Sequence, residues 1–268
     1  MADTWAARRD TFRALHASGL FVIPNPWDIG SARLLESLGF KALATTSSGF
    51  AAAIGRPDYG VDRSDLLSHV EALAAAVEIP LSVDAERCFG EDPAGVAETV
   101  GLIAKAGAAG CSIEDYDPQQ GAIDPLEIAV ERVAAAASTA RENGMVLTAR
   151  AENHLHGIDN LDDTISRLSA YRDAGAEVVY APGLVEPDDI RRLVNSVGVP
   201  VNVLALRHGP STDQLVELGV RRVSTGGGLA RAAYGALLAG ARELRDAGTS
   251  GYLDGAIAGS ELQALLRS

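Results

Sequence analysis

Short apolar runs alternate with longer amphipathic segments along the whole chain. Eight of the runs are rich in Val, Ile and Leu, as expected of parallel strands that are buried on both faces. Their starts are spaced by about 29 residues on average, which is the length of a strand–helix unit. We therefore predict strands at residues 21–24, 42–47, 81–85, 110–115, 146–152, 178–182, 201–205 and 222–226.

The segments between these runs have the spacing of helices that bury one face. Examples are residues 62–77, 92–106, 124–143, 161–174 and 188–196, several of which begin at an N-capping Asp and end near a glycine. Eight strand–helix units predict an α/β fold, a (β/α)8 TIM barrel in one domain over residues 1–268, with a helical tail at about 250–268. A doubly wound sheet is the alternative, but no Gly-x-Gly-x-x-Gly motif follows the first strand.

The composition of the chain argues against several classes of binding partner and several kinds of site. The chain has 36 acidic and 23 basic residues and a net charge of −13, which argues against nucleic acid and anionic membranes as partners. Two cysteines form neither a disulfide framework nor a zinc cluster, and the first residues lack the apolar core of a signal peptide. No apolar stretch is long enough to span a bilayer. We expect a cytoplasmic protein.

The lysines exclude one kind of carbonyl chemistry. Lys41 precedes the second predicted strand and Lys105 lies in the helix after the third, so neither stands where a barrel places its active site. An imine-forming aldolase is therefore disfavoured, and metal polarisation of a carbonyl is the expected alternative.

Carboxylates gather at the ends of two neighbouring predicted strands. Asp84 and Glu86 end the third strand, where alternation puts them on one face, and Glu114 ends the fourth. Converging carboxylates repel each other unless a cation neutralises them, and a hard divalent ion such as Mg2+ suits oxygen ligands. The alternative is that these acids cap helices or pair with Arg87 and Arg150.

Other polar groups stand at the same ends. Arg150 could bind a substrate carboxylate or phosphonate in a fork, or pair internally with Glu152 or Glu114. The turn at Thr46, Ser47 and Ser48 could present donors to an anion or be an ordinary turn. The glycine-rich residues 224–228 before the last helix could bind phosphate or allow close packing.

Six segments in this order resemble the phosphoenolpyruvate mutase/isocitrate lyase superfamily, in its phosphonomutase-like branch. They are Pro-Asn-Pro-Trp-Asp with Ser-Ala-Arg at 24–33, Gly-Arg-Pro-Asp at 55–58, Val-Asp-Ala-Glu with Phe-Gly at 83–90, Ile-Glu-Asp at 113–115, Ala-Arg-Ala-Glu at 149–152 and Pro-Val-Asn-Val at 200–203. The resemblance implies cleavage or formation of a C–C or P–C bond beside a pyruvate unit, through an enolate stabilised by Mg2+. It also implies a homo-oligomer, a dimer or tetramer whose barrels exchange the last helix.

The resemblance also assigns roles to individual residues. It implies Mg2+, or Mn2+ in its place, on Asp84, Glu86 and Glu114, with Asp58 near the metal's waters. Substrate contacts would come from Thr46, Ser47, Ser48, Arg150 and Asn202. The C-terminal leucines at 262, 265 and 266 share one helical face that could pack on a neighbouring subunit or on the chain's own barrel.

Two departures from the family pattern shape the expected activity. Glu86 stands where the family usually has Asp. The loop at 116–125 lacks both the Lys-Lys/Arg-Cys-Gly-His motif of the isocitrate lyases and the Lys and Asn-Ser of the phosphonomutases. We therefore expect a Mg2+-dependent lyase that cleaves a C–C bond of a small 2-oxo or 2-hydroxy carboxylic acid by decarboxylation or retro-aldol cleavage.

Arg150, Glu152 and Asp58 are the expected catalytic residues, with Tyr180 and His154 as further candidate bases. Two alternatives stay open. One is a phosphoenolpyruvate or phosphonopyruvate mutase or hydrolase that acts on a P–C bond, and the other is an inactive carboxylate-binding homologue.

Overall fold

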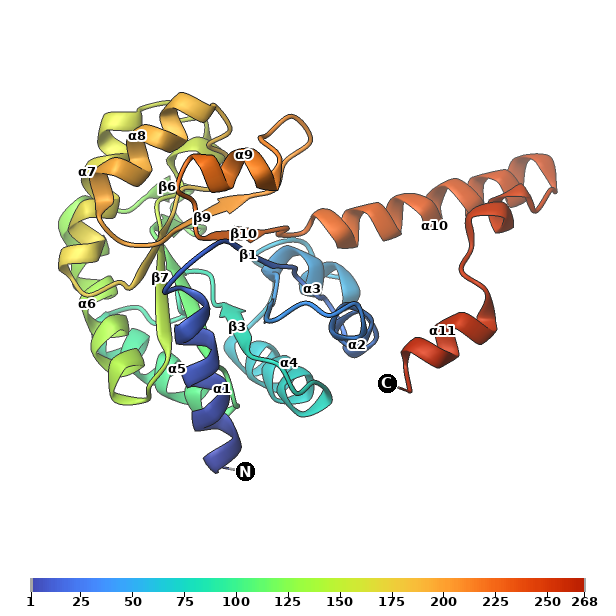
Figure 1. Ribbon diagram of the computed structural model, residues 1–268, viewed down its shortest axis with the longest axis horizontal. Coiled ribbons are helices and arrows are strands. Elements are labelled where there is room, and N and C mark those ends of the chain that lie inside the picture. The colour runs from blue at the N-terminus through green and yellow to red at the C-terminus, as the bar shows by residue number, and fades with distance from the viewer. Residues whose placement is uncertain (1, 268) are drawn as a thin grey trace.

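The computed structural model describes residues 2–267, and within them eight parallel strands form the predicted TIM barrel (Figure 1). Neighbours follow the order β1-β10-β9-β8-β7-β4-β3-β2. At the seam between β1 and β2, the Ala44 N–H donates to the Pro24 carbonyl at 3.1 Å. The strands are β1 (Phe21–Ile23), β2 (Leu43–Ala44), β3 (Leu81–Asp84), β4 (Gly110–Glu114), β7 (Val146–Arg150), β8 (Val178–Tyr180), β9 (Val201–Leu204) and β10 (Arg222–Ser224).

Helices surround the sheet, and a small antiparallel hairpin, β5 (Tyr116–Asp117) with β6 (Ala122–Ile123), follows β4. The five predicted helices each appear within two residues of the expected bounds. The helices are α1 (Ala2–Leu15), α2 (Ile29–Ser37), α3 (Ser47–Ala53), α4 (Arg63–Ala76), α5 (Pro93–Lys105), α6 (Leu126–Glu142), η1 (Asn153–His156), α7 (Leu161–Asp173), α8 (Pro187–Val197), α9 (Thr212–Glu217), α10 (Gly228–Ala247), η2 (Gly251–Gly255) and α11 (Gly259–Leu265).

The second strand is shorter than the predicted 42–47. It ends at Ala44 because Thr46 is the N-cap of α3, and its hydroxyl accepts a hydrogen bond from the Gly49 N–H at 3.3 Å. The polar turn expected after this strand is thus the first turn of a helix, whose residues face the mouth of the barrel.

The end of the barrel where the strands begin is closed by α1. Phe12 of this helix is fully buried among residues at the strand starts, including Phe21, Val146 and Val178. Gly110 makes this fit possible, because a Cβ there would lie 2.6 Å from the Phe12 ring. Access to the barrel interior is therefore from the ends where the strands finish.

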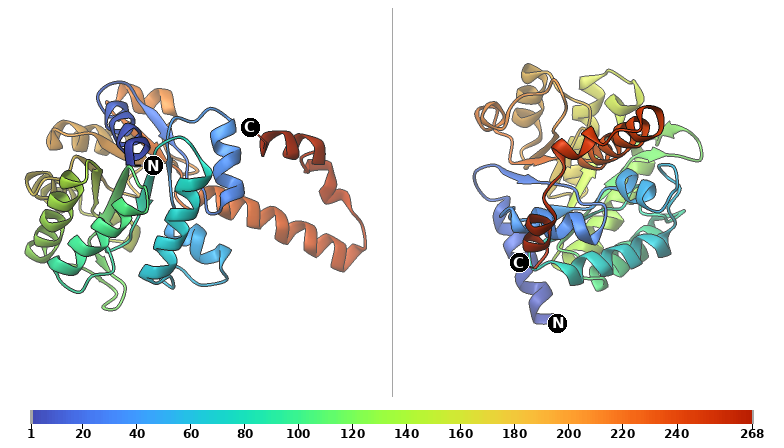
Figure 2. Two further views of the ribbon diagram at one scale, coloured as in Figure 1. Left: turned by 90° about the horizontal axis from the view of Figure 1, so that it is seen from below. Right: turned by 90° about the vertical axis from the view of Figure 1, so that its right-hand side faces the viewer.

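The C-terminal part leaves the barrel. Helix α10 projects away from it, and α11 returns to contact α2 (Figures 1 and 2). Exposed leucines mark the projecting helix, with Leu237 at 64% and Leu238 at 51% exposure. Leu262, Leu265 and Leu266 are half-buried. No helix between residues 2 and 267 is both long and apolar enough to cross a bilayer.

Candidate active site

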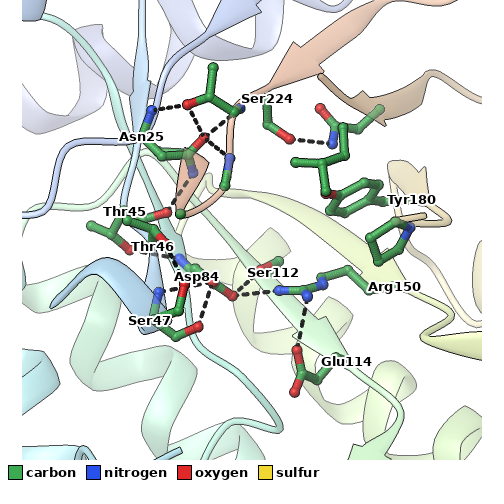
Figure 3. Close-up of a pocket in the computed structure, with 18 of the residues that line it drawn as sticks. Asn25, Thr45, Thr46, Ser47, Asp84, Ser112, Glu114, Arg150, Tyr180 and Ser224 are labelled. Carbon is green, nitrogen blue, oxygen red and sulfur yellow. Dashed lines mark hydrogen bonds and ion pairs between the residues drawn. The ribbon is translucent and has the colours of Figure 1, made fainter. Parts of the chain in front are cut away.

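A cavity of about 240 Å³ opens at the strand ends, where barrel enzymes carry their chemistry (Figure 3). Neither Lys41 nor Lys105 lines it. It brings together nearly all the residues that the sequence singled out: Thr46, Ser47, Ser48, Asp58, Asp84, Glu114, Arg150, Glu152 and Asn202. Their presence in one cavity is a structural finding, while their catalytic and binding roles stay predictions.

Arg150 lies between the carboxylates of Asp84, Glu114 and Glu152, which form the acidic wall of the cavity. Its Nη1 lies 2.6 Å from Asp84, its Nη2 3.1 Å from Glu114 and its Nε 2.8 Å from Glu152. The strand register explains the contact with Glu114, because Glu114 and Arg150 are paired residues on the neighbouring strands β4 and β7. Burial alone would lower the pKa of Arg150, but the carboxylates of Glu152, Glu114 and Asp84 hold it well above its usual value. The guanidinium therefore remains charged.

The Asp84 carboxylate receives further donors from the start of α3 and from β4. The backbone N–H and hydroxyl of Ser47 donate to it at 3.1 and 3.0 Å, and the Ser112 hydroxyl lies at 3.4 Å (Figure 3). Both donors of Ser47 are thus directed at Asp84 rather than at open space. Ser48 is different, because its hydroxyl contacts only that of Thr46, at 3.3 Å, among the hydrogen bonds of residues 2–267.

Glu152 is held in place by the buried Asp115. One Asp115 oxygen accepts the Glu152 N–H at 2.9 Å, and the other accepts the hydroxyl of Tyr171 at 2.6 Å and pairs with Arg167 at 3.2 Å. These contacts fix the main chain at the end of β7. Burial raises the pKa of Glu152, because the side chain has no exposed surface, and the charge of Arg150 opposes this rise.

The acidic wall has the character of a cation site. Within residues 2–267, Glu114 Oε1 and Glu152 Oε2 are buried without a hydrogen-bond partner. Asp58 also lines the cavity, and burial together with the Asp84 charge raises its pKa. Carboxylate oxygens in excess of nearby positive charge suit a hard divalent cation. The described chain holds no ready-made cluster of three or more acidic, His or Cys ligands, so water or substrate oxygens would have to complete the coordination.

Glu86 lies outside this cavity. The strand ends at Asp84, and the main chain at Glu86 turns to a φ of 49°, so the alternation expected to align the two carboxylates stops. Glu86 faces a neighbouring hollow that is also lined by Arg87 and Asp117. Burial and the charges of Asp84 and Asp58 raise its pKa to about 8. Its metal-binding role stays a prediction.

Asn202 lies on the floor of the cavity with its amide already engaged. Its oxygen accepts from Arg222 Nε at 2.9 Å, and its nitrogen donates to the Ser224 hydroxyl at 2.9 Å. Arg222, which the sequence reasoning missed, also donates to Thr148 at 3.0 Å and lies 3.4 Å from the ring of His16. The sequence held one signal for this residue: a charged side chain stands in the last predicted strand, where an apolar one is expected.

Aromatic side chains stand at the mouth. Tyr59, also missed, follows Asp58 directly, lines the cavity and hydrogen-bonds to Glu114. Its ring centroid lies 5.5 Å from that of Tyr116, which stacks on His156 at 3.6 Å. Tyr116 belongs to the hairpin in the loop at 116–125. That loop lacks the family's thiol, but it supplies an aromatic contact beside the site.

Comparison with known proteins gives a consistent picture. Residues 12–245 match the family described as phosphoenolpyruvate phosphomutase. A Corynebacterium glutamicum protein named probable 2-methylisocitrate lyase 1 is 30% identical, with 97% of this chain and 89% of that protein covered. An oxaloacetate decarboxylase of Bradyrhizobium is 28% identical, with 81% and 75% covered.

The crystal structure of a candidate lyase/mutase from Burkholderia cenocepacia superimposes with a TM-score of 0.96. The two chains are 49% identical, and 99% of this chain and 98% of that one are covered. The chain therefore belongs to the phosphoenolpyruvate phosphomutase family, and it is a carbon–carbon lyase of the phosphoenolpyruvate mutase/isocitrate lyase superfamily.

Proposed function

We propose that the protein is a Mg2+-dependent lyase that cleaves a C–C bond of a small 2-oxo or 2-hydroxy di- or tricarboxylate. The observation that carries this proposal is the contact of one guanidinium, Arg150, with three carboxylates at the barrel mouth. The similarity to a methylisocitrate lyase and an oxaloacetate decarboxylase supports the same class of reaction and substrate.

Asp84 and Glu114 would hold the cation, with Asp58 near its waters and Glu86 contributing from the adjacent hollow. When bound, Mg2+, or Mn2+ in its place, supplies a Lewis acid that polarises a carbonyl oxygen beside the bond to be cleaved. The Glu114 oxygen without a hydrogen-bond partner among residues 2–267 is consistent with this donor set. We propose these residues as ligands from the chemistry of their oxygens.

Arg150 would bind the substrate carboxylate. A guanidinium has five N–H donors, and the three ion pairs use three of them, so two remain for an anion. Ser48 would offer its hydroxyl, from the start of α3, to another group of the substrate. Thr46, Ser47 and Asn202 are engaged with protein groups and would orient the wall and the floor.

Two reactions fit this site. In decarboxylation, the bond to the departing carboxylate breaks, CO2 leaves, and the electron pair stays on the carbon beside the carbonyl, which then takes a proton. In retro-aldol cleavage, a base must also remove the hydroxyl proton. Glu152 Oε2 is buried and unpartnered among the described residues, so we propose it as the acceptor of that proton.

The proposal is tested by adding Mg2+ and following pyruvate release from oxaloacetate and alkylmalates, with Asp84→Asn as the disabled variant and the surface change Asp213→Asn as its control. We expect release by the wild type and by the control, and loss of release in Asp84→Asn. No release from any substrate by a protein that binds Mg2+ would leave the inactive carboxylate binder as the better description. Phosphorus NMR with phosphonopyruvate separates a P–C enzyme from both.

We further propose that the protein is a cytoplasmic homo-oligomer, a dimer or tetramer in which the C-terminal helix is exchanged between subunits. Helix α10 projects from its own barrel and carries exposed leucines, which a second copy would cover. The two buried free thiols, Cys88 and Cys111, fit a reducing compartment.

A further inference from the structure

Three arginines of the described chain line the cavity, and they differ in what they contact. Arg150 is paired with three carboxylates. Arg222 is buried beneath the cavity, and its contacts are the neutral groups of Asn202, Thr148 and His16. Arg231, in the first turn of α10, is exposed and has neither a hydrogen bond nor an ion pair from its side chain within residues 2–267. Among the described residues, Arg231 is therefore the exposed cavity cation whose guanidinium has no protein partner, whereas that of Arg222 is buried and already hydrogen-bonded.

The guanidinium of Arg231 converges with a hydroxyl from another element. Gly227 lies between them, and a Cβ at that residue would lie 3.0 Å from Arg231 Nη1 and 2.6 Å from Ser48 Oγ. Both groups thus lie against Gly227, where a side chain would displace them, and both line the cavity. Burial and the Asp84 charge raise the pKa of Asp58, and the charges of Arg150 and Arg231 both oppose this rise, so both cations act on the same cavity.

We propose that Arg231, together with the Ser48 hydroxyl, binds a second carboxylate of the substrate, other than the one that Arg150 binds. This subsite selects dicarboxylates over monocarboxylates. The inference rests on the proposed lyase function for the class of ligand. The physical reason is charge: the cavity wall is acidic, and a dianion entering it needs a cation that is not already neutralised. Arg231 supplies this charge with five N–H donors in a planar fork, none of them engaged within residues 2–267.

Malate and lactate provide a matched pair of probes. They share a 2-hydroxycarboxylate unit and differ in the second carboxylate, and binding to the wild type and variants can be measured by calorimetry with Mg2+ present. We expect malate to bind the wild type about tenfold more tightly than lactate, the effect of one charge-assisted hydrogen bond. In Arg231→Gln the malate affinity should fall to that of lactate, while lactate binding changes less than about twofold.

Two further variants complete the test. Arg242→Gln removes an exposed charge from the same helix outside the cavity and should leave both affinities unchanged. Arg231→Lys keeps the charge without the fork and should retain part of the preference for malate. Thermal unfolding of Arg231→Gln should match the wild type, because the side chain has no contact within the described chain that the change would break.

The subsite is overturned if Arg231→Gln weakens malate and lactate equally, if it leaves the preference intact, or if the wild type does not prefer malate. Failure of the proposed lyase function is a separate result. In one outcome the wild type prefers malate and Arg231→Gln loses that preference, yet no product is released from any substrate. That result supports the subsite and contradicts the proposed lyase reaction.

Discussion

Nη1 of Arg150 lies 2.6 Å from Oδ1 of Asp84, and the same guanidinium contacts two other carboxylates. The arginine is thus the counter-charge of the whole acidic wall. A buried charge that loses its partner lowers the free energy of unfolding, typically by about 3–5 kcal/mol.

Removal of that counter-charge should destabilise the fold. We expect Arg150→Gln to lower the free energy of unfolding by about 3–5 kcal/mol, and saturating Mg2+ to recover part of the loss by neutralising the same carboxylates. Urea denaturation with and without Mg2+ measures both effects. The surface change Arg191→Gln, which breaks an exposed pair with Asp188, should have little effect. Equal stabilities of Arg150→Gln and the wild type would contradict this account of the wall.

The two candidate ligands at the end of β3 should differ in importance. Asp84 lines the cavity, whereas Glu86 faces the neighbouring hollow. We therefore expect Asp84→Asn to weaken Mg2+ binding by about 100-fold and Glu86→Gln to weaken it by about tenfold, the lower end of the range that outer-sphere partners show. Calorimetric titration of both variants with Mg2+ shows which substitution weakens Mg2+ binding more. A larger effect of Glu86→Gln would place the cation in the other hollow.

Acid should destabilise the protein through His16. Burial and the charge of Arg222 lower the pKa of this imidazole to about 3, against about 6.5 in the unfolded chain. Nδ1 donates to the Phe12 carbonyl at 2.8 Å, and Nε2 faces Arg222 at 3.4 Å, so a second proton would meet a cation. Between about pH 6.5 and pH 3 the imidazole is protonated in the unfolded chain but not in the folded protein. The contribution of His16 to the free energy of unfolding, which is complete above about pH 6.5, is therefore lost as the pH falls.

His16→Gln removes this titration. Its unfolding free energy should depend less steeply on pH between about 6.5 and 4, by up to about 1.4 kcal/mol per pH unit. Chemical denaturation at several pH values gives the slope. His69, whose pKa burial lowers to about 4, titrates in both proteins and serves as an internal reference. Identical slopes in the variant and the wild type would show that His16 does not carry the effect.

The projecting helix should decide the state of assembly. Leu237→Glu places a charge on the exposed apolar surface of α10 and should shift the protein from an oligomer to a monomer, as read by light scattering after size-exclusion chromatography. Leu38→Glu is the control, because Leu38 is exposed to a similar extent, 67%, on the barrel itself. A monomeric wild type would contradict the proposed exchange of helices.

Strand and helix positions follow from the sequence because short apolar runs alternate with longer segments that are bounded by capping residues and glycines. All eight predicted strands exist, and the chief error, the length of the second, arose because a hydroxyl cap at Thr46 ended the strand early. That residues 1–268 form a single domain stays a prediction.

The site was predictable only in part. Residues at strand ends, such as Asp84 and Arg150, could be found because the barrel brings those ends together. Glu86 could not be placed, because its side chain depends on a left-handed backbone after the strand. Tyr59 and Arg231 come from a loop and a helix start, whose approach to the cavity depends on tertiary packing that periodicity does not encode.

The central claim is that a cation and a substrate carboxylate meet at Arg150 in this cavity. A crystal structure of the protein soaked with Mg2+ and oxalate tests it most directly. The account predicts Mg2+ at about 2.0–2.1 Å from carboxylate or water oxygens beside Asp84 and Glu114, with oxalate between the metal and Arg150. An empty cavity at saturating ligand, or a cation bound only in the hollow beside Glu86, would contradict it.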